Sequence, residues 1–193
     1  MDNFKLIRYS DIRPDILKEI FKNIVENYLK VSQKKLRNIE EEDKAKLMIE
    51  GLKDELIIYY PGIENWFNKI IKEIDKDNRK RELFLVIVPN KRNIELAGIL
   101  ILKNTENEKK ICTIRVIENF RNNGIGTKLF EKSFEYLETK TPLITLPEEC
   151  YKEEFKSLLE KYKFKMTNKV IGAYRKNKIE YFFNEGIRSS YFA

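Results

Sequence analysis

The stretch "FRNNGIGTKLF", residues 120–130, contains two of the seven glycines in this 193-residue chain, and an arginine stands three residues before the first. It follows an apolar, β-branched segment, "ICTIRVI" (111–117), and leads into apolar residues at helical spacing. A strand that turns directly into a helix leaves N–H groups at the helix start, where the helix dipole favours an anion. Glycines let an anion approach the backbone, and an arginine adds a charge-assisted hydrogen bond. The stretch therefore predicts a phosphate-binding turn, although an ordinary tight turn can show the same pattern.

The spacing of these glycines excludes two common phosphate motifs. No Gly-Lys-Ser/Thr follows a four-residue gap, so the stretch is not a P-loop. Only one Gly-x-Gly is present, in mid-chain and among predicted antiparallel strands, so the dinucleotide fingerprint does not fit either. Asn122 and Asn123 are residues that adopt turn conformations at low cost.

Outward from this turn, apolar periodicity predicts the order of the secondary structure. A short opening strand is expected, then helices, three antiparallel strands, a helix, a strand, a helix that starts near Pro147, and a closing hairpin. The segments are 4–10 for the opening strand; 16–29, 47–60 and 61–74 for helices; 82–89, 94–104, 111–117 and 143–146 for strands; and 163–184 for the hairpin. This order predicts an α+β fold with a mostly antiparallel sheet and one parallel crossover.

Composition excludes several classes of protein. The length fits one domain, 42% of the residues are hydrophobic, and no apolar run approaches the roughly 18 residues that span a bilayer. The N-terminus has no apolar signal-peptide core, so we expect a cytoplasmic protein without a membrane partner. No histidine is present, which excludes imidazole bases. Cys112 and Cys150 lie far apart and match no metal or redox spacing, so we expect no metal cofactor.

The net charge of +7 is concentrated in one half of the chain. Residues 81–193 contain 21 Lys/Arg and 15 Asp/Glu, a difference of +6. A basic half suits an anionic ligand such as a nucleotide cofactor, an acidic substrate or RNA. Solvated surface lysines would produce the same excess, so charge alone does not decide between them.

Together the motif and its context resemble the GNAT superfamily of N-acetyltransferases. The phosphate motif of that family is Arg/Gln-x-x-Gly-x-Gly/Ala at a strand–helix junction, and Arg121, Gly124 and Gly126 fill its fixed positions. Val116, Gly98 and the segment "LLEKYKF" (158–164) also match family positions, so the resemblance extends from about residue 82 to 184. It implies a GNAT-like mixed, mostly antiparallel sheet with splayed central strands and flanking helices, plus an extended helical N-terminal region.

The resemblance also implies an acetyl-CoA site. Backbone amides of the turn would bind the pyrophosphate, Arg121 would hold the turn, and the pantetheine arm would pair with the strand before it like an added strand. The implied cofactor-binding residues are Ile114, Arg115 and Val116 on the strand, and Arg121, Asn122, Asn123, Gly124, Ile125, Gly126 and Thr127 in the turn. We expect acetyl-CoA as co-substrate, and the fourth and fifth strands (111–117 and 143–146) should splay to admit it.

The catalytic residues depart from the family pattern. GNAT enzymes commonly protonate the leaving thiolate with a tyrosine, but alignment of "LLEKYKF" places Leu159 at that position. Tyr151 and Tyr162 are the candidate acids, although each is also the kind of residue that packs in a core. Cys112 stands where the family often has a base, and no nearby group in the sequence would activate it as a nucleophile.

Three functions remain open at this point. The first is acetyl-CoA-dependent transfer of an acetyl group to a primary amine, carried by a small molecule, a protein or aminoacyl-tRNA. The second is an acetyl-CoA-binding sensor or interaction module without catalysis. The third is RNA binding, which only the basic half favours. We expect one domain over residues 1–193, with a helical substrate-side region (1–80) and an acetyl-CoA-binding core (82–184). The sequence contains no motif that identifies the acceptor or the oligomeric state.

Overall fold

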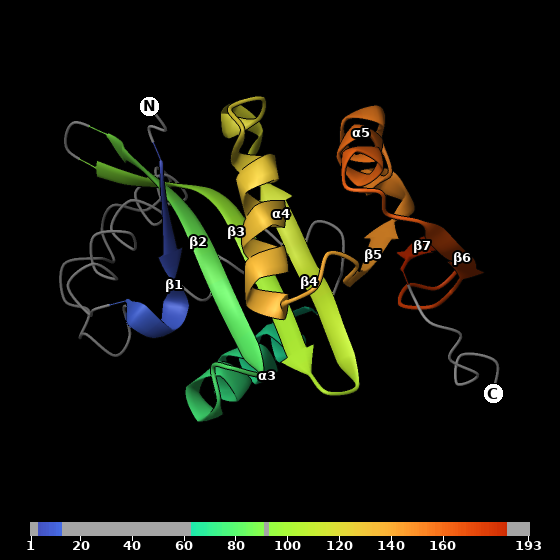
Figure 1. The fold of residues 1–193 in the computed structure, drawn as a ribbon, viewed down its shortest axis with the longest axis horizontal. Helices are drawn as coiled ribbons and strands as arrows, with labels where there is room; N and C mark the ends of the chain where they lie inside the picture. Colours follow the sequence, from blue (N-terminus) through green and yellow to red (C-terminus); the bar gives the residue numbers. More distant parts are fainter. Residues whose placement is uncertain (1–3, 13–62, 91–92, 185–193) are drawn as a thin grey trace, which may run out of the picture.

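The computed structural model describes residues 4–12, 63–90 and 93–184. In this part of the chain the strands form one seven-stranded sheet in the order β1-β2-β3-β4-β5-β7-β6 (Figure 1). The strands are β1 (Lys5–Arg8), β2 (Arg81–Asn90), β3 (Asn93–Thr105), β4 (Glu108–Val116), β5 (Leu143–Pro147), β6 (Met166–Ile171) and β7 (Ile179–Phe183). The α-helices are α3 (Ile63–Lys76), α4 (Ile125–Leu137) and α5 (Glu153–Lys161), and short 3-10 helices are η1 (Tyr9–Asp11), η2 (Glu118–Phe120) and η3 (Glu148–Cys150).

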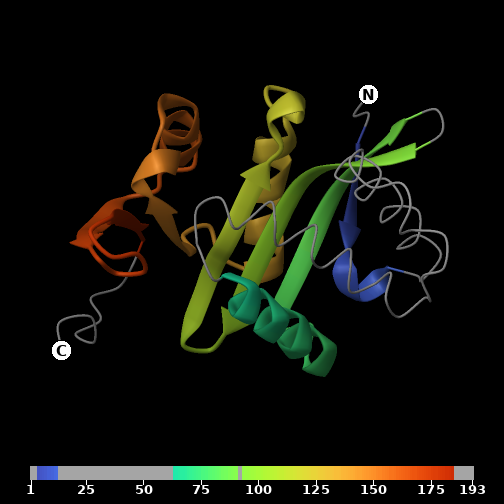
Figure 2. The ribbon, with the colours of Figure 1, turned by 180° about the vertical axis from the view of Figure 1, so that it is seen from behind.

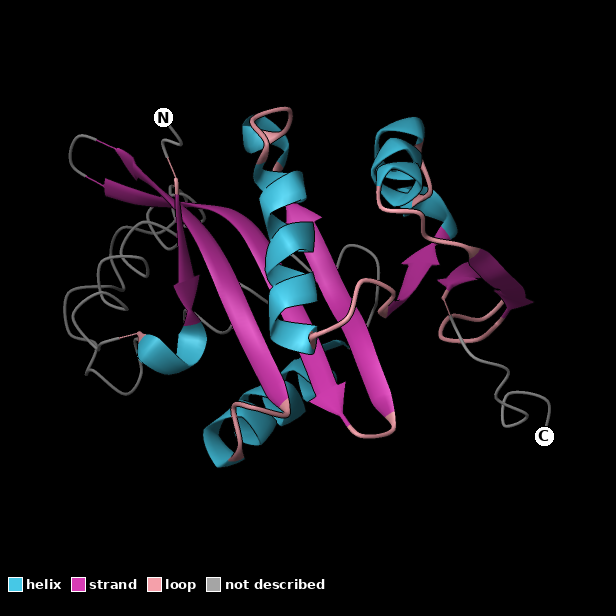
Figure 3. Cartoon of the chain, in the orientation of Figure 1, coloured by secondary structure: helices cyan, strands magenta, loops and turns pink. Residues whose placement is uncertain are grey.

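The sheet topology confirms the predicted fold class. Every neighbouring pair of strands is antiparallel except β4 and β5, which are parallel and are connected through α4. The opening strand, the three-strand meander and the closing hairpin all lie where apolar periodicity predicts them (Figure 3). Of the predicted N-terminal helices, α3 is described, and the segments 16–29 and 47–60 lie outside the described residues.

Helices cover both faces of the sheet, because the strands of its centre are apolar on both sides. Figure 1 shows α4 in front of the central strands, and Figure 2 shows α3 on the opposite side; we call these the α4 face and the α3 face. Phe67 and Ile70 of α3 pack with Leu85 on one face, and Phe130 of α4 packs with Leu100 on the other. Full burial of such a side chain contributes about 1.5–3 kcal/mol, so the two layers stabilise the strands that flank the site.

One element begins later than the sequence predicts. Pro147 and the acidic residues after it predict a helix start, but η3 forms there instead and α5 begins only at Glu153. The backbone of Lys152 is extended (φ −100°, ψ 164°), which interrupts the helical path. Tyr151 therefore lies in the connection between η3 and α5 rather than on the helix.

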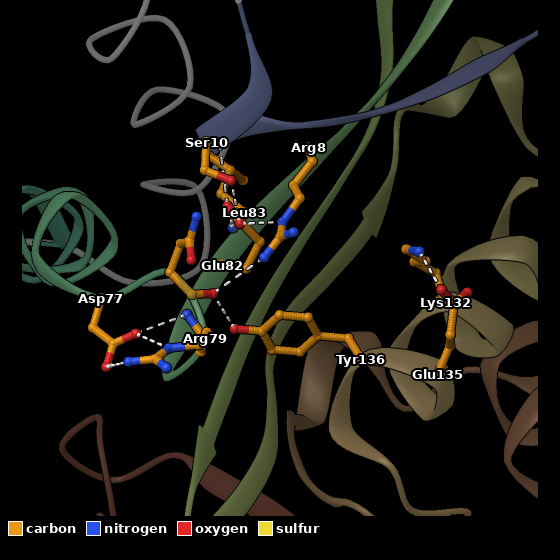
Figure 4. Close-up of polar contacts among 10 residues, drawn as sticks. Arg8, Ser10, Asp77, Arg79, Glu82, Leu83, Lys132, Glu135 and Tyr136 are labelled. Carbon is orange, nitrogen blue, oxygen red and sulfur yellow. Dashed lines mark hydrogen bonds and ion pairs between the residues drawn. The ribbon is translucent and has the colours of Figure 1, made fainter.

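A buried carboxylate joins β1 to β2 (Figure 4). Glu82 is 0% exposed and accepts hydrogen bonds from Arg8 Nε (2.5 Å), Ser10 Oγ (2.7 Å) and the N–H of Leu83 (3.0 Å). Beside it, the Tyr136 hydroxyl donates to the carbonyl of residue 78 (2.7 Å), and burial, with Glu82 nearby, raises the tyrosine pKa well above its usual value. These contacts connect the N-terminal strand to the sheet and to α4.

Among the described helices, none is long and apolar enough to cross a membrane.

Candidate active site

The two parallel strands at the middle of the sheet separate soon after they meet. β4 and β5 pair only at Lys110 with Leu143 and at Ile111 with Ile144. The register of β4 against β3 shifts at this level, so Cys112 is an extra residue between its paired neighbours. Such a β-bulge bends the strand and increases its local twist. The predicted splay of the fourth and fifth strands is thus present, and the bulge lies at its start.

The separation produces a cleft of about 470 Å³ between the two strands. Its lining residues come from β4, from the turn into α4, from α4 itself, and from β5, η3 and α5. They are Ile111–Val116, Phe120, Arg121, Asn122, Gly124–Thr127, Phe130, Ile144–Pro147, Glu149, Cys150, Lys152, Phe155 and Leu158. Nine of the ten residues proposed for the cofactor line this cleft, and Asn123 is the exception.

The turn before α4 reverses the chain and leaves backbone N–H groups at the helix start. Asn122 (φ 63°) and Gly124 (φ 77°) adopt left-handed conformations that reverse the chain between η2 and α4. Asn123 Nδ2 donates to the carbonyls of Phe120 (3.3 Å) and Arg121 (3.2 Å) and so stabilises the turn. The Gly124 carbonyl accepts the first hydrogen bond of α4, from Lys128 (3.1 Å). The N–H groups of residues 125–127 precede that bond and have no acceptor within the helix.

The two glycines of the turn serve different steric needs. A Cβ atom on Gly124 would meet no atom within 4 Å, but its positive φ disfavours other residues. A Cβ atom on Gly126 would lie 3.3 Å from Leu158 Cδ1 and 3.9 Å from Val116 Cγ2. Gly126 therefore allows α4 to lie close to both α5 and β4. Arg121 Nε donates to the Val116 carbonyl (3.4 Å), which connects the motif arginine to the end of β4.

Neither candidate tyrosine lines the cleft. Tyr151 packs its ring on Tyr181 (4.5 Å between centroids), and its neighbours Cys150 and Lys152 both line the cleft. Tyr162, at the C-terminal end of α5, is stacked on Phe130 (5.4 Å). Its hydroxyl is buried and makes no hydrogen bond within the part of the chain that the structure describes.

Leu159, which aligns with the tyrosine of the family, has an apolar side chain that packs in the core. Leu159 is 2% exposed and belongs to the apolar core beneath α4. Leu158 and Phe155, on a neighbouring side of α5, line the cleft instead. An acid in the cleft therefore has to come from a position other than 159.

Cys112 lines the cleft at the bulge, but its environment keeps the thiol protonated. Burial raises the cysteine pKa, and the nearby cations Arg81 and Lys110 offset this only in part. Arg81 Nη1 lies 3.1 Å from Cys112 Sγ. Since the thiolate is the nucleophilic form, the site gives no sign of a reactive cysteine at position 112.

Several cleft residues on the C-terminal side were not predicted from the sequence. They are Thr145, Pro147, Glu149, Cys150 and Lys152. Burial acts to raise the pKa of Glu149, but hydrogen bonds from its own backbone N–H, Arg175 (2.9 Å) and Lys178 outweigh this and keep that pKa below its usual value. Glu149 is therefore a paired carboxylate rather than a base at neutral pH. Among the described residues, no group of three potential metal-ligating side chains lies together.

The sheet is mixed and opens between its two parallel strands, beside an Arg-x-x-Gly-x-Gly turn at a helix N-terminus. This arrangement defines a class of proteins that transfer acyl groups. The chain belongs to the acetyltransferase (GNAT) family, whose model matches residues 48–164, more than half of its length. It is an acyltransferase by this membership. No curated protein matches the chain.

Solved structures share the fold at low sequence identity. An acetyltransferase of the GNAT family from Desulfovibrio desulfuricans superposes with a TM-score of 0.56 at 10% identity, over 93% of this chain and 96% of that one. The ribosomal-protein-S5-alanine acetyltransferase from Vibrio fischeri gives 0.55 at 11% identity, over 95% and 92%. A GNAT-family acetyltransferase from Streptococcus pneumoniae gives 0.50 at 15% identity, over 93% and 96%. These similarities support the fold alone.

Proposed function

We propose that this protein transfers the acetyl group of acetyl-CoA directly to a primary amine. The observation that carries the proposal is the cleft between β4 and β5, which begins at a glycine turn on the N-terminus of α4. The glycine-turn end of the cleft suits phosphate. The walls of the cleft are mostly apolar, which suits a long and partly apolar cofactor arm.

The chain would hold the cofactor mainly through backbone groups. The N–H groups of residues 123–127 would donate to pyrophosphate oxygens, and Arg121 would add a charged contact at the exposed rim. Residues 114–116 of β4 lie beyond the two pairs that β4 makes with β5. The pantetheine arm would lie along this part of β4 and pair with its backbone like an added strand.

Direct transfer places two requirements on the protein. The bound thioester supplies an activated acetyl carbon. The amine must lose its proton before it attacks, because only the neutral form has a free electron pair. As the new C–N bond forms and the C–S bond breaks, the sulfur leaves with the electron pair and takes up a proton. The protein must therefore accept one proton from the amine, through a base or water, and deliver one to sulfur.

Tyr151 and Tyr162 remain the proposed donors of that second proton. Tyr151 is favoured because Cys150 and Lys152, on either side of it, line the cleft. Tyr162 is less favoured, because its hydroxyl is buried and its ring is stacked on Phe130.

Calorimetry with acetyl-CoA and a thiol-release assay over an amine panel test the proposal in two parts. We expect binding together with thiol release for at least one amine, and the panel includes peptides with free N-termini and an aminoacylated tRNA fraction. Binding without release over the whole panel would favour the sensor or interaction module. Absence of binding would refute both.

A further inference from the structure

One lysine lines the cleft, and it stands at the start of α5. Among the described residues, Lys152 is the only lysine in the lining. It directly precedes the first residue of α5, and its backbone is extended. Its carbonyl accepts hydrogen bonds from the N–H groups of Phe155 (3.0 Å) and Lys156 (2.9 Å). The backbone of α5 therefore fixes the place of this lysine at the wall of the cleft.

The wall that carries Lys152 lies close to the opposite wall. Phe155, three residues further along, also lines the cleft, and its ring centroid lies 5.9 Å from that of Phe130 on α4. The residue before a helix and the third residue within it lie side by side, as the reciprocal contacts of capping boxes show. Lys152 therefore borders the cleft close to the point where α5 meets α4, and a molecule that fills the cleft would lie beside it.

The amine of Lys152 is exposed and is not engaged by a carboxylate. The described residues provide no hydrogen bond or ion pair to this side chain. The acids nearest to it in the sequence have other partners: Glu149 pairs with Arg175 (2.9 Å), and Glu153 pairs with Lys156 (2.6 Å). No ion pair among the described residues therefore holds the amine away from the cleft.

We propose that Lys152 is a self-acetylation site, whose amine takes the acetyl group of acetyl-CoA bound in the same cleft. This inference rests on the acetyl transfer proposed above and names one amine of the chain itself as an acceptor. Three cations line the cleft, and they are Arg115, Arg121 and Lys152. Acetylation would convert the third of them into a neutral amide.

The reaction balances without any further reagent. The Lys152 ammonium first loses a proton to water, because only the neutral amine has a free electron pair. Its Nζ atom attacks the carbonyl carbon of the thioester, so that a C–N bond forms and the C–S bond breaks. The sulfur leaves with the electron pair and takes up the second proton that the nitrogen loses. The products are an amide on Lys152, the free thiol of CoA and one proton in solvent.

Mass spectrometry of the protein incubated with acetyl-CoA alone, without an added amine, tests the proposal. We expect Lys152 to be acetylated at least about tenfold faster than Lys165, because an amine held beside the thioester reacts as if within one molecule. Lys165 is the matched control, since it is also exposed but does not line the cleft. The rate constant should not depend on protein concentration. A thiol assay should show a burst of CoA equal to the amount of protein.

Three variants connect the modification to the cleft. Lys152→Arg should remove the burst but still bind acetyl-CoA in calorimetry, because it keeps the positive charge. Lys165→Arg should leave the burst unchanged. Gly126→Val should acetylate Lys152 no faster than Lys165, because its valine would fill space at the proposed pyrophosphate site.

Equal acetylation rates of Lys152 and Lys165 in a protein that binds acetyl-CoA would overturn the site, as would an unmodified Lys152. A rate constant that increases with protein concentration would indicate transfer between molecules and would also overturn it. So would a burst that persists in Lys152→Arg.

The proposed function has its own readout, because Lys152→Arg should still release thiol when an amine from the panel is added. Turnover of an added amine without modification of Lys152 in the unaltered protein would refute the self-acetylation site alone. Absence of acetyl-CoA binding would refute both proposals together.

Discussion

The Leu158 Cδ1 atom lies 3.3 Å from the place that a Cβ atom on Gly126 would take. The absence of a side chain at Gly126 therefore leaves room for Leu158 of α5 beside the start of α4, and both residues line the cleft. A valine at position 126 would press on Leu158 and fill space at the proposed pyrophosphate site. We expect Gly126→Val to abolish acetyl-CoA binding in calorimetry while circular dichroism shows a folded protein. Unchanged affinity in that folded variant would sink the cofactor assignment.

Gly124 and Gly172 form a matched pair for a second test of the turn. Both have positive φ (77° and 80°), and a Cβ atom on either would meet nothing within 4 Å. Alanine at each should therefore cost a similar amount of stability, roughly 1–2 kcal/mol for a left-handed residue. Only Gly124→Ala should also weaken acetyl-CoA binding, because Gly172 does not line the cleft. Equal acetyl-CoA affinities of the two variants would contradict a phosphate site at this turn.

Tyr151→Phe should lower the maximal rate of acetyl transfer by at least about tenfold, the lower end of the contribution of a positioned acid. Acetyl-CoA affinity should change little, because the hydroxyl would act only as the thiolate leaves. Tyr162→Phe is the comparison. It removes a buried hydroxyl that makes no hydrogen bond among the described residues, so stability should be maintained or rise slightly. Full rates in both variants would exclude both tyrosines as the acid.

Cys112 should be dispensable for chemistry and slow to react. Since burial raises its pKa, the thiolate fraction at pH 7 lies below that of a free cysteine and grows only as the pH rises. Cys112→Ala should keep most of the turnover at saturating acetyl-CoA, and mass spectrometry should find little alkylation of Cys112 by iodoacetamide at pH 7. An acetyl adduct on Cys112 together with ping-pong kinetics would show this prediction to be wrong.

The Arg8–Glu82 pair should contribute measurably to stability. Glu82 is fully buried, so Arg8→Met would leave its charge without its closest cation. Loss of one partner of a buried pair costs about 3–5 kcal/mol, and we expect roughly 2–3 here because the Arg8 side chain is 34% exposed. Urea unfolding measures the change. Arg79→Met, at an exposed pair with Asp77, should change stability far less, because solvent screens that pair. Equal losses of unfolding free energy in Arg8→Met and Arg79→Met would contradict the expectation that burial of Glu82 makes its ion pair the more important one.

The central fold was predictable because its strands are long and apolar. β2, β3 and β4 carry β-branched runs that read as strands without tertiary information, and the glycine turn marks the junction with α4. The bulge at Cys112 was not predictable, because one extra residue in a strand changes neither its composition nor its turn signals. The late start of α5 was missed for a similar reason. Pro147 and two glutamates suit a helix start, but the extended backbone of Lys152 separates η3 from α5.

The glycine turn at the cleft was accessible from sequence, whereas most of the wall formed by β5, η3 and α5 was not. The turn is contiguous, so a motif can describe it. Thr145 lines the cleft from β5 and reads as an ordinary strand residue, so nothing in the sequence marked it. Arg115 was expected at the cleft, and a charged residue within a largely apolar strand segment is itself a signal, because it needs a polar environment once it is buried.

The short pairing between β4 and β5 has a consequence for the width of the cleft. Only two residue pairs join these strands, so side-chain contacts between α4 and α5 also limit how far the walls stand apart. Phe130 of α4 and Phe155 of α5 both line the cleft, with ring centroids 5.9 Å apart. The width of the cleft at this level is thus limited by two aromatic rings. Leucine or alanine at either position would widen it.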